Sequence, residues 1–143
     1  MVGIVTRAAS YASHKNWPHW NKLVGSAKGI DFARIGSDTG FVLEPAPNLF
    51  DFAPEHDWAN LIAQLSLCDV VVGACGSLSY LASELGKKRV VFFSMNDPEY
   101  LGMDPHEIVR WKSAEKDYFI VKARGSLDFG AEQVLGALLG LLK

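Results

Sequence analysis

Apolar residues follow two alternating patterns along the chain. Short continuous apolar runs, rich in β-branched side chains in the second half, predict buried strands. These runs occupy residues 2–6, 31–35, 69–73, 89–93 and 117–121. Longer segments are amphipathic or otherwise helical in pattern, with apolar residues at spacings of three and four in the clearest cases. The predicted helices cover residues 16–28, 56–67, 77–85 and 130–142.

The alternation of strands and helices predicts the arrangement of the fold. Strands joined by helices form right-handed crossovers, which build a parallel sheet. We therefore expect an α/β fold: a single Rossmann-like open parallel sheet with helices on both faces, formed by residues 1–143. Ligands on such sheets bind beyond the carboxyl ends of the strands. That edge should carry Thr6, Gly36, Gly73 and Ser94.

Two details of the first half of the chain follow from residue type. Asn16 is suited to cap the first helix, and Pro18 would then fall in its first turn, where a missing N–H costs nothing. Trp17 and Trp20 fit core positions of this helix. Residues 44–55 contain three prolines and are expected to be irregular.

Composition restricts the class of protein. The chain has 143 residues, 49% of them hydrophobic and 21% charged, which suits one globular domain and excludes disorder. A net charge of -2 gives no long-range attraction to nucleic acid or to an anionic membrane. The sequence contains neither a membrane-spanning apolar run nor a signal-peptide layout, so we expect a cytoplasmic protein.

The cysteines and the metal-binding residue types add little chemistry. Cys68 and Cys75 lie in or beside one predicted strand, too far apart for a disulfide if that strand stays extended. Reduced thiols are expected, in keeping with the cytoplasm. The sequence has no spacing typical of a metal site, and we expect no metal.

The strand-to-helix turn at residues 72–77 is the most distinctive local feature. Its glycines would let a ligand approach the backbone, and the first turn of the following helix favours an anion such as phosphate. Ser77 would either cap that helix or donate its hydroxyl to the same ligand. In the simpler interpretation Gly76 and Ser77 are only turn and cap. The sequence around Ser77 is neither a GxGxxG nor a GxSxG motif.

Other polar residues are expected at the same edge. Lys15 precedes the first helix and is a point charge suited to a phosphate. Asp97 and Glu99 would hydrogen-bond a ribose or a sugar, or Asp97 would merely start a turn before Pro98. No pair of carboxylates indicates a general acid and base, so the catalytic residues stay unknown.

In several segments the chain resembles the C-terminal, donor-binding half of GT-B glycosyltransferases, most closely the heptosyltransferase-like family 9. The similar segments follow the same order along both sequences. They are Lys15-Asn16-Trp17-Pro18, Cys68-Asp69-Val70-Val71-Val72-Gly73, Tyr80-Leu81-Ala82-Ser83-Glu84-Leu85-Gly86 and the strand and loop Val90–Pro98.

The resemblance implies half of a GT-B fold that binds a nucleotide-diphosphate sugar as substrate or ligand, with no other cofactor. Lys15, Gly76 and Ser77 would meet phosphate. Asn96 and Asp97 would border the donor pocket. A GT-B enzyme also needs an acceptor-binding domain, which carries the family's catalytic base, so we expect no transfer by this chain unless a protein partner supplies that domain.

The chain departs from the family pattern at the turn. The family's Asp-Thr-Gly reads Cys75-Gly76-Ser77 here, and its following histidine is Tyr80. Two alternatives therefore stay open. One is a small nucleotide- or nucleoside-processing enzyme, completed by dimerisation, with Glu84, Asp97 or Glu99 as the acid–base group. The other is a non-catalytic interaction module on the same fold.

Overall fold

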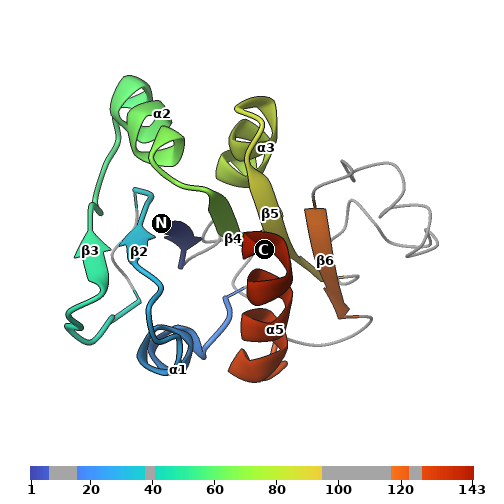
Figure 1. The fold of residues 1–143 in the computed structure, drawn as a ribbon. Helices are drawn as coiled ribbons and strands as arrows, with labels where there is room; N and C mark the ends of the chain where they lie inside the picture. The colour runs from blue at the N-terminus through green and yellow to red at the C-terminus, as the bar shows by residue number, and fades with distance from the viewer. Residues whose placement is uncertain (7–15, 38–40, 95–116, 123–126) are drawn as a thin grey trace.

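The computed structural model describes residues 1–6, 16–37, 41–94, 117–122 and 127–143. Within these residues, parallel strands form one six-stranded sheet in the order β3-β2-β1-β4-β5-β6 (Figure 1). The strands are β1 (Val2–Val5), β2 (Phe32–Arg34), β3 (Leu49–Asp51), β4 (Val70–Ala74), β5 (Lys88–Ser94) and β6 (Asp117–Lys122). The helices are α1 (Trp20–Ser26), α2 (Trp58–Ser66), α3 (Ser77–Glu84) and α5 (Ala131–Leu142).

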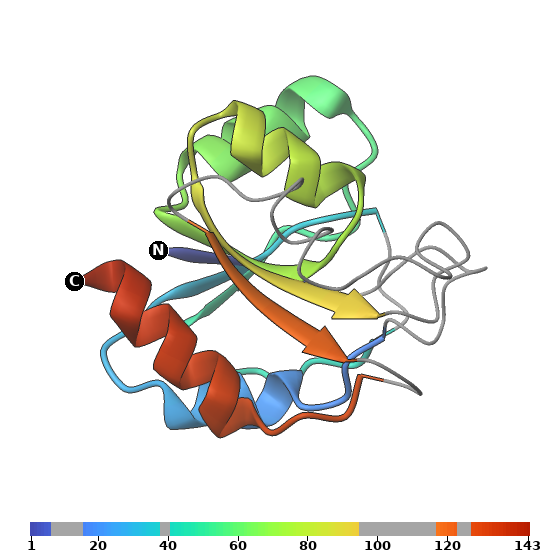
Figure 2. The same ribbon diagram turned by 90° about the vertical axis from the view of Figure 1, so that its right-hand side faces the viewer.

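The helices lie on both faces of the sheet, which confirms the predicted α/β architecture. Helices α1 and α5 cover one face, and α2 and α3 cover the other (Figures 1 and 2). The strand arrowheads point to one edge of the sheet, while both chain ends lie toward the opposite edge (Figure 2). The carboxyl edge is therefore formed by the turns that leave the strands.

Strand β3 lies inside the stretch that was expected to be irregular, so that expectation was wrong. The strand is too short to show a pattern in the sequence, and its pairing with β2 identifies it. The Phe32 N–H donates to the Asn48 carbonyl at 2.7 Å, and the Phe52 N–H donates to the Arg34 carbonyl at 3.1 Å. The Arg34 guanidinium also donates to both carboxylate oxygens of Asp51, at 2.8 and 2.5 Å.

Helix α1 begins at Trp20 with His19 as its N-cap, so the predicted start at Asn16 was wrong. Trp17 is only 1% exposed although it precedes the helix. Its indole N–H donates to the Phe129 carbonyl at 2.8 Å, which fixes the approach to α1 against the approach to α5. The sequence pattern predicted too early a start because both tryptophans are buried. Trp20 lies in the helix, whereas Trp17 lies in the segment before it.

An aromatic cluster fills the core between the sheet and the helices α1 and α5. The Trp17 ring contacts Trp20 edge to face, with centroids 4.8 Å apart, and contacts Phe92 of β5 at 5.2 Å. Phe129 stacks on Trp17 at 5.7 Å and contacts Phe92 at 4.9 Å. The cluster therefore joins one sheet strand to the segments that lead into both helices.

Strand β4 has no side chain at Gly73, the position that lies beside Val5 of β1. The register places Val5 opposite Gly73. A Cβ atom at Gly73 would lie 2.9 Å from the Val5 Cβ and 3.1 Å from the Val5 carbonyl oxygen. The pairing of β1 with β4 therefore leaves no room for a side chain at this position.

Replacing Trp17 with alanine should lower the free energy of unfolding by about 3–5 kcal/mol, because it opens a cavity and leaves the Phe129 carbonyl without its donor. The matched control is Trp58→Ala, since Trp58 is 57% exposed. That variant should change stability by no more than about 0.5 kcal/mol. Urea denaturation followed by far-UV circular dichroism measures both, and equal losses would contradict the assigned burial.

Replacing Gly73 with alanine should cost about 1–3 kcal/mol of unfolding free energy, because the new methyl group overlaps Val5. Gly25→Ala is the control. Gly25 lies in α1, and a Cβ there meets no atom within 4 Å. Alanine favours a helix over glycine, so this variant should gain about 0.5–1 kcal/mol. Opposite signs in the two denaturation midpoints are expected, and a stabilised Gly73→Ala variant would refute the close approach.

Candidate functional site

The order of the sheet marks where a ligand would bind. From β1 the chain adds β2 and β3 on one side, and it then returns to add β4, β5 and β6 on the other. The order reverses between β1 and β4. Open α/β sheets bind ligands at such a reversal, just beyond the carboxyl ends of the two strands. Here these ends are Val5 and Ala74, which places the candidate site beside the turn identified from the sequence.

The turn from β4 into α3 is well defined. The Cys75 N–H donates to the Phe92 carbonyl at 2.9 Å, which extends the pairing of β4 with β5 by one residue. Gly76 is the N-cap of α3, and no side-chain hydrogen bond caps this helix among the described residues. Ser77 is the first helical residue and is exposed, so the interpretation of Ser77 as the cap was wrong.

Gly76 leaves open space at the tip of α3. Its backbone is extended, a conformation that any residue adopts, so the turn itself does not require glycine. Within the described part of the chain, a Cβ at this position would come within 4 Å of the Ala74 carbonyl oxygen alone, at 3.9 Å. N–H groups in the first turn of a helix have no partner within the helix and favour an anion. The start of α3 therefore offers backbone donors and an exposed hydroxyl, and Gly76 adds no side chain beside them.

The neighbouring strand ends contribute small or buried groups. Thr6 follows β1 and is 3% exposed. Gly36 follows β2 with φ at +133°, a conformation that favours glycine, and a Cβ there would lie 3.6 Å from Leu78 of α3. The turns after β2 and β4 therefore approach each other, as expected of residues at one edge.

The structure brings together two of the predicted site residues. Gly76 and Ser77 are adjacent at the start of α3. Lys15, Asn96 and Asp97 lie outside the described residues, as does Glu99. Glu84 is the exposed last residue of α3, about 10 Å along the helix axis from Ser77, so it belongs to the solvated end of the helix.

Two contacts near the turn involve residues for which we predicted no binding role. The Cys75 thiol donates to the Tyr80 hydroxyl at 3.5 Å, which joins the turn to the first turns of α3. Arg89 of β5 is 3% exposed and donates to the Ser79 carbonyl at 2.9 Å. A charged residue at the start of an otherwise apolar predicted strand could have drawn attention to Arg89. Its partner, Ser79, lies ten residues away in the sequence and could not be predicted from that pattern.

The two cysteines have different surroundings, and neither forms a disulfide. Cys68 is 1% exposed, and burial raises the pKa of its thiol to about 11. Cys75 is half-buried beside Gly76. Among the described residues, no group of three or more His, Cys, Asp or Glu side chains could hold a metal ion. No helix within the described ranges is long and apolar enough to cross a membrane.

Comparison with known proteins identifies the fold. No protein-family model matches the chain, and no curated protein matches it in sequence. Among solved structures, E. coli ADP-heptose lps heptosyltransferase II matches with a TM-score of 0.75 and 20% identity, over 99% of this chain and 46% of that chain. E. coli heptosyltransferase WaaC with ADP matches with a TM-score of 0.69 and 16% identity, and the match covers 98% of this chain and 43% of that chain.

A third match is the dodecameric iron-containing heptosyltransferase TibC in complex with ADP-D-beta-D-heptose. It has a TM-score of 0.65 and 17% identity, and the match covers 99% of this chain and 45% of that chain. The chain thus spans less than half the length of the heptosyltransferases it matches. At these identities the likeness shows the fold: this chain has the α/β fold of heptosyltransferases of the GT-B class, over a length consistent with their C-terminal half.

Proposed function

We propose that this chain binds a nucleotide-diphosphate sugar as the donor-binding half of a GT-B glycosyltransferase. The observation that carries the proposal is the start of α3, which no side chain of the described residues caps, at the point where the strand order reverses. Two of the heptosyltransferase structures with the same fold were solved with ADP or ADP-heptose. A diphosphate is the part of such a ligand that the backbone donors of a helix start suit best.

Local groups have to hold this anion, since the net charge of -2 gives no general attraction. We propose that Ser77 and the first-turn N–H groups of α3 contact the diphosphate, together with Lys15. In the sequence Trp17 follows Lys15 by two positions, and Trp17 contacts Phe92, which pairs with Ala74 at the end of β4.

We further propose that sugar transfer requires a second domain, on this polypeptide or on a partner. The chain spans 43–46% of the length of the heptosyltransferases it matches. In the GT-B class the acceptor-binding half carries the catalytic base. The 143 residues should therefore bind a donor without transferring its sugar.

Thermal denaturation with nucleoside diphosphates and their sugars tests the binding proposal. ADP, UDP, GDP and CDP and their hexose or heptose derivatives are the probes. At 100 times its Kd, the matching ligand should stabilise the protein by about 2.7 kcal/mol. Lys15→Ala and Ser77→Ala should each weaken binding by roughly tenfold, the loss of one charge-assisted or hydroxyl hydrogen bond.

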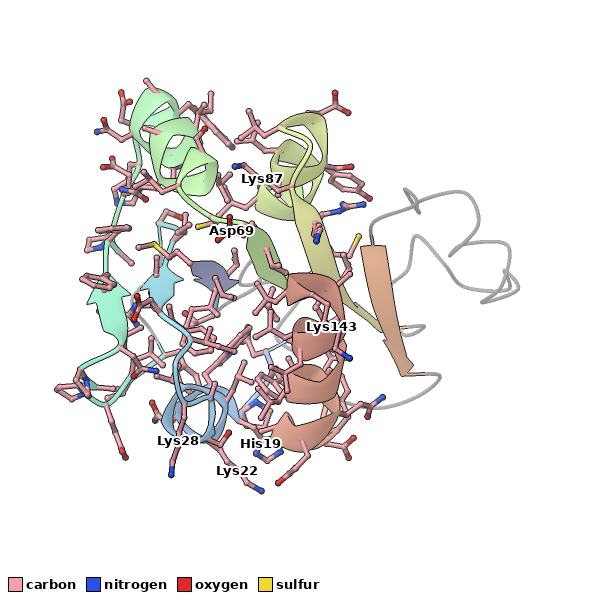
Figure 3. All side chains as sticks on the ribbon, viewed as in Figure 1. His19, Lys22, Lys28, Asp69, Lys87 and Lys143 are labelled. Carbon is pink, nitrogen blue, oxygen red and sulfur yellow. The ribbon has the colours of Figure 1, made fainter. Side chains whose placement is uncertain are left out.

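Lys28→Ala and Ser66→Ala are matched controls. Lys28 follows α1 (Figure 3), and Ser66 ends α2, where its hydroxyl donates to the Ile62 carbonyl at 2.7 Å. Both side chains are exposed, and both variants should bind like the unmodified protein. A protein that none of these probes stabilises would refute the proposed function.

Thiol labelling gives an independent test of where the ligand lies. Iodoacetamide at pH 8 should modify Cys75, whereas Cys68 should stay unmodified because it is buried and its pKa of about 11 keeps it protonated. A saturating nucleotide diphosphate at the start of α3 should slow the labelling of Cys75 by about tenfold or more, read by mass spectrometry. Cys75→Ser is the control and should show no fast labelling. An unchanged Cys75 rate under saturation would place the ligand elsewhere.

A further inference from the structure

Arg89 holds the first turn of α3 from beneath. One guanidinium nitrogen, Nη1, donates to the Ser79 carbonyl at 2.9 Å and lies 3.3 Å from the Ser79 hydroxyl. Arg89 is 3% exposed and Ser79 is 7% exposed, so the contact is inside the protein. Ser79 is the third residue of α3. The contact therefore reaches the part of the helix nearest the candidate site.

A buried guanidinium needs a reason at this position. Taking the charge out of water is costly, and an apolar side chain of similar size often stabilises a core as well or better. The neighbouring residue of β5 on the same side of the sheet, Val91, is apolar and only 2% exposed. What Arg89 supplies instead is a directed, charge-assisted hydrogen bond, which is short and sensitive to geometry.

Helices α2 and α3 are fixed at their starts in different ways. The Asp57 side chain caps α2 and accepts the Asn60 N–H at 3.0 Å. Such a cap occupies the tip of the helix with a carboxylate. Helix α3 has no side-chain cap hydrogen bond among the described residues, and Gly76 leaves its tip open. The bond from Arg89 secures the first turn from the side of the sheet and places no side chain at that tip.

We propose that Arg89 is a positioning residue for the diphosphate site, fixing through Ser79 the direction of the first-turn N–H groups of α3. The proposal rests on the proposed function. Binding sites built from backbone donors tolerate only small errors in position and angle. A first turn that can tilt on the sheet would therefore bind a diphosphate more weakly, even in a protein that is fully folded.

Three variants separate the parts of the contact. Arg89→Met keeps much of the length and volume and removes the donor. Arg89→Lys keeps the charge with a different geometry, and Ser79→Ala removes the hydroxyl only. Lys87→Met is the matched control, because Lys87 also donates to a backbone carbonyl, that of Ser66 at 2.7 Å, but it joins α2 to the end of α3 rather than to its start (Figure 3).

Hydrogen exchange measures the hold on α3 without any ligand. In Arg89→Met the α3 amides, beginning with the Tyr80 N–H that donates to the Gly76 carbonyl, should exchange about tenfold faster, while β4 stays protected. Arg89→Lys should fall between this variant and the unmodified protein. Lys87→Met should leave the amides of the first turn unchanged.

Calorimetry then measures whether the hold serves binding. The probes are whichever of ADP, UDP, GDP and CDP binds the unmodified protein most tightly, and the corresponding monophosphate. Arg89→Met should weaken diphosphate binding by about tenfold and monophosphate binding by less. The ratio of the monophosphate Kd to the diphosphate Kd should therefore fall. Arg89→Lys should recover part of this ratio, and Lys87→Met should retain it.

The outcomes distinguish this proposal from the function on which it rests. A lower melting temperature with an unchanged Kd ratio and unchanged exchange in α3 would show that Arg89 is only structural, while the proposed function would stand. Unmodified protein that binds none of the diphosphates would overturn both. If Arg89→Met does not fold, Arg89→Lys decides by the same ratio, and an unchanged ratio in that variant overturns the proposal.

Discussion

Packing around the Trp17 ring is the interaction on which the carboxyl edge of the sheet depends. The ring lies between Trp20, Phe92 and Phe129, which come from α1, from β5 and from the segment before α5. Its indole N–H also satisfies the Phe129 carbonyl. A single buried side chain thus connects segments that are far apart in the sequence. Removing it would loosen two helices and one strand together, because interiors of this kind are close-packed.

The candidate site depends on the rigidity of this framework. At Gly73 the central strands leave no room for a side chain beside Val5, and their pairing fixes the positions of Val5 and Ala74. Helix α3 starts at Ser77, three residues after Ala74, and no side chain of the described residues caps it. This arrangement suits the recognition of an anion by backbone donors. In the proposed function, local backbone donors rather than the overall charge of -2 hold the diphosphate.

The sequence predicted what depends on local patterns and missed what depends on distant contacts. The β-branched run Val70-Val71-Val72 and the turn at Gly76 were visible because strand and turn preferences are local. Strand β3 was invisible, because three residues among prolines become a strand only through pairing with β2. The spacing of Trp17 and Trp20 resembled a helix although only Trp20 lies in one. The role of Arg89 depends on Ser79, which no pattern places beside it.

The position of β1 in the sheet has a consequence for how the chain folds during synthesis. Val2 lies opposite Phe32 on one side and opposite Val70 on the other. The first partner is made early, but the second appears only after β2, β3 and α2 have been completed. Until then one side of β1 presents unpaired backbone and apolar residues, the kind of edge that joins with other chains. Val2 and Ile4 of β1 are wholly buried in the finished protein. During synthesis, however, β1 stays without its second partner strand until β4 has left the ribosome.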